Sequence, residues 1–325
     1  MSPYVYLVIP VGIGLGLYLL RKIRELQWGW VRNRYPLTGR LFIITGSNTG
    51  LGYETAKALV SREATVIMAC RDMEKANNAI ENIRKITKNG ELIPLQLDLA
   101  SFDSTRKFAA EIKAKYPTFD CLINNAGLGI ETPQYTQEGY ELHCGVNHLG
   151  HFLLFDLLKD NIKNSNARVV VVSSKLHEIR TKIDLENFGK WVERPRGERF
   201  NLLYGNSKLM NFYFTRELYK NGYDAHVLCP GLCNTDFFRY YFQRKWYQYV
   251  LLAPIALVLV RSAEQGAQNI IHCATDNVNT DAKNPCTGYY VSSLKMTKSK
   301  VQFDEAVSEQ LWKESERQVA LHSPK

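Results

Sequence analysis

The chain has 325 residues, of which 45% are hydrophobic and 22% are charged. This composition is ordinary for a globular protein with a full core, and it excludes a disordered or low-complexity chain. The net charge of +9 suits nucleic acid, a membrane surface or an acidic ligand as partner, so the position of the basic residues has to decide between them.

The first 40 residues hold more than half of the charge excess. Residues 1–20 carry no charged side chain, whereas residues 21–40 carry six basic and one acidic side chain, a net charge of +5. An uncharged run followed by basic residues is typical of a membrane anchor with its basic end in the cytosol. We therefore expect an anchor over 1–20, a basic juxtamembrane segment over 21–39, membrane lipid as a partner, and no nucleic-acid partner. A removed signal peptide or a buried core helix is the alternative.

Seven cysteines are scattered along the chain, and no Cys-x-x-Cys pair occurs among them. An odd number without paired spacing predicts buried free thiols rather than a disulfide framework. Such thiols suit a reducing compartment.

From residue 40 onward, short apolar runs alternate with helical patterns. Continuous apolar runs bounded by turns are typical of buried parallel strands, and apolar residues at three- and four-residue spacing within 72–88 predict a helix. This alternation predicts an α/β fold, a doubly wound Rossmann-type sheet of about seven mostly parallel strands with helices on both faces, in one domain over 40–325. The expected strands are 41–45, 64–70, 91–99, 119–124, 167–173, 225–230 and 287–292, and a final helix is expected around 303–320.

The first expected strand leads directly into a glycine-rich turn, TGSNTGLG at 45–52. Glycines between a first strand and a first helix let the backbone approach a pyrophosphate, whose charge sits at the helix N-terminus. A purely structural turn is the alternative. The second strand ends at Cys70 and Arg71, where an acidic residue would favour NAD(H) and an arginine favours NADP(H). We therefore expect NADP(H) rather than NAD(H), although Asp72 competes as a ribose ligand or a helix cap.

Several motifs occur in a consistent order along residues 38–325. The glycine turn, Asn124-Asn125-Ala126-Gly127, and Tyr204 with Lys208 four residues later together resemble the short-chain dehydrogenase/reductase family. The runs VNHLGHF at 146–152, VSS at 172–174, CPG at 229–231 and EQGAQ at 264–268 resemble its membrane-bound retinol dehydrogenase-like subgroup, and the 17β-hydroxysteroid dehydrogenases share much of this pattern.

Tyr204 and Lys208 stand four residues apart on one face of an expected helix. Reduction of a carbonyl needs an acid to protonate the oxygen, and a phenol with a pKa of about 10 needs a nearby cation to serve near neutrality. We expect Tyr204 to be this acid and Lys208 the cation. Ser174, at the end of the fifth strand, would orient the substrate oxygen, and Asn147 would support a water relay behind Lys208.

The resemblance also implies a set of cofactor contacts. Asp98 would lie at the adenine, Lys208 at the nicotinamide ribose and Thr235 at the nicotinamide. The implied cofactor-binding residues are Gly46, Asn48, Gly50, Leu51, Gly52, Arg71, Asp98, Asn125, Gly127, Tyr204, Lys208 and Thr235.

Two further features have competing interpretations. His143, His148 and His151 could suggest a metal site, but the last two match the family's helical motif, and we expect no metal. The run 246–260 is uncharged and contains Pro254, within the region 235–262 that forms the substrate lid in this family. An apolar lid implies a lipophilic substrate and contact with the bilayer. A core helix or an oligomer contact is the alternative.

Together these features predict a membrane-anchored, NADP(H)-dependent oxidoreductase acting on a lipophilic alcohol or carbonyl. A retinoid is the expected substrate, and a steroid or a fatty aldehyde is the alternative. A catalytically silent NADP-binding scaffold at a lipid surface is a second alternative. A homodimer is a possible assembly. The expected location is the endoplasmic reticulum membrane with the catalytic domain facing the cytosol, or else a lipid droplet.

Overall fold

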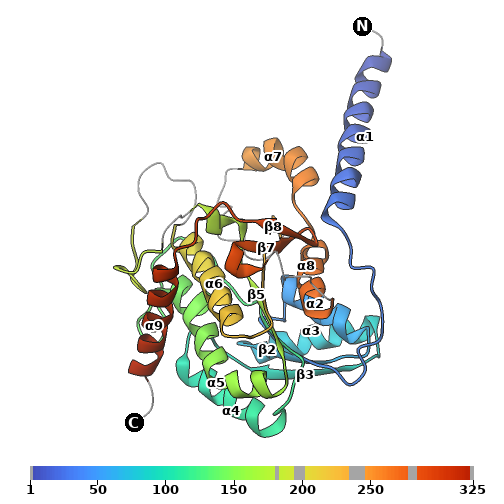
Figure 1. Ribbon diagram of the computed structural model, residues 1–325. Coiled ribbons are helices and arrows are strands. Elements are labelled where there is room, and N and C mark those ends of the chain that lie inside the picture. Colours follow the sequence, from blue (N-terminus) through green and yellow to red (C-terminus); the bar gives the residue numbers. More distant parts are fainter. Residues whose placement is uncertain (1–2, 180–182, 194–201, 234–245, 277–283, 323–325) are drawn as a thin grey trace.

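The computed structural model describes the backbone of residues 3–179, 183–193, 202–233, 246–276 and 284–322. Side chains are described for the same residues except 3–11, 13, 246–252 and 287. Figure 1 shows a central sheet covered by helices on both faces, with the first helix running away from the body of the domain.

Within the described residues, eight strands form one sheet in the order β3-β2-β1-β4-β5-β6-β7-β8. All neighbours are parallel except β7 and β8, which form an antiparallel hairpin. The expected doubly wound, mostly parallel α/β fold is confirmed, and β8 is one strand more than the sequence indicated. The strands are β1 Leu41–Thr45, β2 Thr65–Cys70, β3 Glu91–Gln96, β4 Cys121–Asn124, β5 Arg168–Val172, β6 Ala225–Leu228, β7 Tyr289–Ser292 and β8 Lys295–Lys298.

The helices divide between the two faces of the sheet because alternate strand residues point to opposite sides. Val169 and Val171 belong to a buried cluster with α4, α5, α6 and α9, whereas Val170 and Val172 belong to a cluster with α2, α3 and α8. The helices are α1 Pro3–Trp28, α2 Gly50–Val60, α3 Met73–Ile86, α4 Phe102–Lys115, α5 Gly150–Asn164, α6 Leu202–Lys220, α7 Trp246–Leu259, α8 Ala263–Thr275 and α9 Glu305–Leu321. A π-helix η1 (His143–Leu149) and the 3-10 helices η2 (Lys175–Glu178) and η4 (Pro285–Thr287) complete the described elements.

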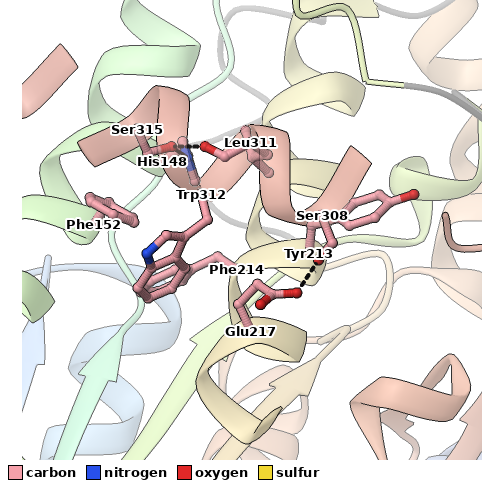
Figure 2. Close-up of a pocket in the computed structure, with 9 residues that line it drawn as sticks. All are labelled: His148, Phe152, Tyr213, Phe214, Glu217, Ser308, Leu311, Trp312 and Ser315. Carbon is pink, nitrogen blue, oxygen red and sulfur yellow. Dashed lines mark hydrogen bonds between the residues drawn. The ribbon is translucent and has the colours of Figure 1, made fainter. Parts of the chain in front are cut away.

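The last helix closes one face of the domain with paired polar contacts as well as apolar ones. Figure 2 shows Ser308 and Ser315 of α9 meeting Glu217 of α6 and His148 of η1. The Ser308 hydroxyl donates to Glu217 Oε1 at 2.5 Å, and His148 Nε2 lies 2.8 Å from Ser315 Oγ. The Ser315 hydroxyl already donates to the Leu311 carbonyl, so His148 Nε2 must carry a proton and donate. His148 therefore serves the docking of α9.

Residues 3–20 of the expected anchor lie in α1, which continues through Arg21, Lys22 and Arg24 to Trp28. Where side chains are described, no helix combines the length and the apolarity that crossing a membrane would require. All seven cysteines are free and six of them are buried, as the sequence predicted.

Candidate active site

The loops at the carboxyl ends of β1, β2, β4, β5 and β6 surround one cavity of about 740 Å³. This is the edge at which open parallel sheets bind their ligands. Gly52 and Asn147 are not part of its wall, and Thr235 lies outside the described residues. The expected site residues that line it are Gly46, Asn48, Gly50, Leu51, Arg71, Asp98, Asn125, Gly127, Ser174, Tyr204 and Lys208.

Gly46 and Gly52 show why the turn between β1 and α2 is built from glycine. Gly46 has φ +65°, and a Cβ there would lie 3.0 Å from Ala126. A Cβ on Gly52 would overlap the Gly46 carbonyl oxygen. Gly52 therefore acts on the cavity indirectly, by letting α2 start close beneath the turn.

The N-terminus of α2 differs from those of α3, α4, α8 and α9. Those four helices begin with a side chain that accepts a hydrogen bond from the first turn, whereas Thr49 at the start of α2 does not. Gly50 and Leu51 of this first turn line the cavity. Uncapped N–H groups at a helix N-terminus attract an anion, so these residues fit the pyrophosphate of a dinucleotide.

The turn after β4 is fixed to the end of β1 by Thr45 and His151. His151 Nδ1 faces the Asn147 carbonyl oxygen at 3.2 Å and so carries the proton, which leaves Nε2 to accept from the Thr45 hydroxyl at 2.9 Å. The same hydroxyl accepts from the backbone N–H groups of Asn125 and Ala126 at 3.0 and 2.9 Å. Burial lowers the pKa of His151 to about 3, so the ring is neutral in this network.

Tyr204 and Lys208 lie one turn apart on α6, and both are buried. Lys208 Nζ lies 5.7 Å from the centre of the Tyr204 ring and donates to the Val172 carbonyl at 3.0 Å. Burial lowers the pKa of Lys208 to about 8, so most of the side chain is still charged at neutral pH. Lys208 thus brings a buried positive charge beside the phenol.

Ser174 follows β5 and caps η2 by accepting from the Leu176 N–H at 3.2 Å. The neighbouring Ser173 is buried, and its hydroxyl donates to the Lys208 carbonyl at 2.8 Å. The two serines therefore divide two tasks: Ser173 fixes α6 against β5, and Ser174 faces the cavity that Tyr204 also lines.

Asn147 lies on the π-helix η1, behind Lys208 as seen from the cavity. Its Oδ1 accepts from the Leu128 N–H at 2.9 Å, and its Nδ2 donates to the Leu128 carbonyl at 3.1 Å and to Ser207 Oγ at 3.0 Å. A Cβ built on Gly127 would lie 3.1 Å from Lys208 Nζ and 3.4 Å from Asn147 Oδ1. The two polar atoms therefore converge on the space that Gly127 leaves, which is where a relay behind Lys208 would have to pass.

The other end of the cavity is lined by Arg71, Asp72, Lys75 and Asp98. Asp72 Oδ1 accepts from the Lys75 N–H at 3.0 Å, and its Oδ2 pairs with Lys75 Nζ at 3.0 Å. These contacts favour the helix-cap interpretation of Asp72 over the ribose-ligand one. Arg71 is exposed at the cavity wall, and Lys75 is a second cation there that the sequence did not single out.

Sequence reasoning also missed a buried pair beside the phenol. His143 Nε2 accepts from the Ile130 N–H at 3.0 Å, so Nδ1 carries the proton and donates to Glu141 Oε1 at 2.5 Å. The His143 ring packs edge-on against the Tyr204 ring, with centroids 6.1 Å apart. Among the described residues no three metal-ligating side chains converge. The only signal in the sequence was the presence of both residues just before the VNHLGHF run.

Comparison with known proteins agrees with this architecture. A family model described as short chain dehydrogenase matches residues 40–182. Human retinol dehydrogenase 13 is 35% identical over 100% of this chain and 97% of its own length. The chain belongs to the short-chain dehydrogenase/reductase family.

Within that family its relatives include further retinol dehydrogenases. Human retinol dehydrogenase 12 is 38% identical over 86% of this chain and 87% of its own length, and mouse retinol dehydrogenase 11 is 35% identical over 91% and 92%. The resemblance to the retinol dehydrogenase-like subgroup is thereby confirmed.

Solved structures share the fold. An uncharacterized protein from Mycobacterium paratuberculosis has a TM-score of 0.62 at 29% identity, covering 88% of this chain and 95% of its own. An alcohol dehydrogenase from Thermococcus sibiricus, solved with 5-hydroxy-NADP, has a TM-score of 0.56 at 17% identity, covering 82% and 99%. The second likeness concerns the fold alone.

Proposed function

We propose that this protein is an NADP(H)-dependent oxidoreductase that interconverts retinol and retinal at a membrane. The observation that carries the proposal is the meeting of Tyr204, Lys208 and Ser174 at one wall of the cavity, at the carboxyl edge of the sheet. The similarity to retinol dehydrogenases along the whole chain supports the retinoid. A steroid or a fatty aldehyde is the alternative substrate for the same residues.

A nicotinamide bound in the cavity supplies or accepts the hydride. In the reductive direction Ser174 would hold the carbonyl oxygen, and the Tyr204 phenol would give it a proton as negative charge develops there. The Lys208 ammonium would stabilise the phenolate that remains. Asn147 would support a water relay in the space beside Gly127, and a proton from solvent passing along it would restore the phenol for the next turnover.

The test is retinal reduction by the full-length protein, with Tyr204→Phe as the decisive variant. Removing the hydroxyl should lower kcat by about 10²- to 10⁴-fold, the usual contribution of a positioned acid. Undiminished turnover of retinoids, steroids and fatty aldehydes by this variant would show that the proton comes from elsewhere. If neither form turns over any of these substrates while NADPH still binds, the protein is a scaffold that binds the cofactor without catalysis.

The preference for NADP(H) is part of the proposal and rests on Arg71. A guanidinium at the end of β2 can pair with a 2′-phosphate, and Lys75 adds a second charge on the same wall. Saturation curves with NADPH and NADH, measured side by side, test it. Equal KM values for the two cofactors would remove the role assigned to Arg71.

We further propose that the N-terminal segment attaches the protein to the endoplasmic reticulum membrane, or to a lipid droplet, with the catalytic domain in the cytosol. Its support is the uncharged run over 1–20 followed by basic residues. Fractionation of cells expressing the full chain should place it with membranes, and the chain lacking residues 1–20 should be largely released. Protease treatment of intact microsomes should digest the catalytic domain, and its protection would reverse the assigned orientation.

A further inference from the structure

In α7, side chains are described from residue 253 onward, and this half of the helix is exposed and has no polar face. Residues 253–259 are all apolar, and Ile255 and Leu257 are 55% and 63% exposed. A helix that lies between core and water normally shows a polar face toward the water. An exposed apolar patch of this kind marks a surface that meets another apolar phase.

The adjoining helix α1 presents a second apolar surface. Leu15, Leu19, Ile23 and Leu26 are spaced by three or four residues and are exposed, with Leu26 at 83%. α1 and α7 are in contact, and Figure 1 shows both at the same end of the molecule, beyond the sheet. The two exposed surfaces therefore lie on neighbouring helices.

Arg21 holds the two helices together. Its Nη1 donates to the carbonyl oxygens of Leu257 and Val260 at 3.0 and 2.5 Å, and its Nη2 donates to Gln265 Oε1 at 2.9 Å. The carbonyls at the end of a helix have no partner within it, so one α1 side chain satisfies the end of α7. This fixes α7 relative to α1.

The charges around these helices match an anionic surface. Lys22, Arg24, Arg32 and Arg34 are exposed on α1 or just after it, and only Glu25 opposes them within residues 21–40. Basic side chains next to an inserted apolar surface attract acidic lipid headgroups. A second copy of this chain would carry the same excess of positive charge there, which disfavours self-association through this surface.

The same end of the molecule is connected to the cavity. The guanidinium groups of Arg21 and Arg261 both stack on the Trp28 ring, at 4.8 and 5.1 Å from its centre. Arg261 Nη1 donates to the Pro230 carbonyl at 3.1 Å. Pro230 and Leu232 line the cavity, and Leu232 is itself half exposed. The cavity wall therefore continues into the contacts that hold α1 and α7.

We propose that α1 and α7 form one lipid-binding surface, latched by Arg21, that sits in the interface of a bilayer containing acidic phospholipid. The inference rests on the proposed membrane attachment and adds α7 to it as a second inserted element. With both helices in the interface, the edge of the cavity at Leu232 faces the lipid. A lipophilic substrate would then reach the cavity without crossing water.

The test places an environment-sensitive fluorophore on the full-length protein at Ile255→Cys in α7, Leu26→Cys in α1 or, as the control, Ile86→Cys, which is 66% exposed on α3. Six native thiols are buried, and the unsubstituted chain gives the background labelling. The protein is bound to vesicles of phosphatidylcholine and phosphatidylserine, with and without brominated acyl chains. Quenching by about twofold or more is expected at 255 and 26 but not at 86.

The outcomes separate the two proposals. Quenching at 26 alone overturns the inference and leaves membrane attachment standing. Quenching at neither position overturns the inference, and if the protein also fails to sediment with the vesicles, membrane attachment is removed as well. A blue shift at 255 that grows with protein concentration without vesicles would mean that a second copy covers α7, which also overturns the inference.

Arg21→Gln tests the latch, with Arg317→Gln, an exposed arginine on α9, as its matched control. Loss of Arg21 should abolish the quenching at 255 and preserve it at 26, and the control should change neither. Full quenching at 255 in Arg21→Gln would contradict the latch.

Discussion

The two ends of the cavity are built in different ways. At the end formed by β4, β5, η1 and α6, side chains are buried and held by hydrogen bonds from the fold itself, as Lys208 is by the Val172 carbonyl. At the end formed by β2 and α3, Arg71 and Lys75 are exposed charges on the cavity wall. The first end is rigid before any ligand arrives, as proton transfer demands. The second end of the cavity relies on exposed charges, which favour a ligand of opposite charge but do not hold it in one precise position.

The largest effect is expected from removing the buried charge. Lys208→Met keeps much of the side-chain volume and removes the cation beside Tyr204, so kcat for retinal reduction should fall by about 10²- to 10⁴-fold. The exposed Lys107→Met on α4 is the matched control and should keep full activity. Near-normal turnover by Lys208→Met would mean that the phenol works without this charge, and the contrast between the two ends would lose its basis.

Titration of the same lysine gives a pH signature. Burial lowers the pKa of Lys208 to about 8, so the ammonium is present below that pH and is lost above it. The rate of carbonyl reduction should therefore fall as the pH rises through about 8. A pH–rate profile of kcat checks this, and Lys208→Arg, whose charge persists at high pH, should move the fall upward. A profile that is flat to about pH 10 would exclude the lysine as the titrating group.

At the exposed end, the effect should appear in binding rather than in the chemical step. Arg71→Ser removes a charge-assisted contact to a 2′-phosphate and should raise KM for NADPH by about 10- to 100-fold. KM for NADH and kcat should stay close to their original values. Lys85→Ser, an exposed change on α3, is the control. An equal change for both cofactors would show that Arg71 does not contact the 2′ position.

A smaller effect is expected from filling the space behind Lys208. In Gly127→Ala the new methyl group would lie 3.1 Å from Lys208 Nζ and 3.4 Å from Asn147 Oδ1. It should obstruct the relay and lower kcat by roughly 3- to 10-fold, with little change in KM for retinal. Comparison of kcat and KM with the parent enzyme distinguishes this from a general loss of binding, in which KM would rise instead.

The last expected effect is on the stability of the whole domain in acid rather than on catalysis. Burial lowers the pKa of His148 to about 3. Below about pH 6.5, His148 therefore binds a proton in the unfolded chain but stays neutral in the folded chain. The free energy of unfolding should fall by roughly 1 kcal/mol per pH unit from this group as the pH drops below 6.5. Urea unfolding at several pH values measures this slope. His148→Gln, which keeps a donor for Ser315, should flatten it, and an unchanged slope would mean that His148 does not contribute.

The hairpin of β7 and β8 is a part of the fold that sequence patterns did not predict. Two-residue hairpin turns with positive φ normally carry asparagine or glycine, but here Ser293 and Leu294 occupy them, with φ +52° and +57°. The Leu294 side chain packs over Gly29, and its N–H donates to Asn269 Oδ1 at 2.9 Å. Tertiary contacts thus support a turn that local preference disfavours. The strand Lys295–Lys298 that follows it is polar at both ends, so it contains no run of apolar residues that would predict a strand.

The candidate site divides in the same manner. Tyr204, Lys208, Ser174 and the glycine turn could be placed from the sequence, because each belongs to a short motif that resembles the family's and stands at the end of an expected strand or on an expected helix. The paired Glu141 and His143 could not, since nothing local distinguishes a buried His–Glu pair from a solvated one. Only the packing of η1 against α6 brings the His143 ring to Tyr204.

The strand–helix alternation, the glycine turn and the chemical types at the cavity can be inferred from the amino-acid sequence, because these depend on residue order and short spacing. Which polar groups have partners is known only from the folded chain. The tertiary structure assigns Asp72 to a helix cap and His148 to the docking of α9, and it places Arg21 at the end of α7, 236 residues away. The physical reason is that a hydrogen bond or a buried charge depends on groups that meet only when the chain has folded.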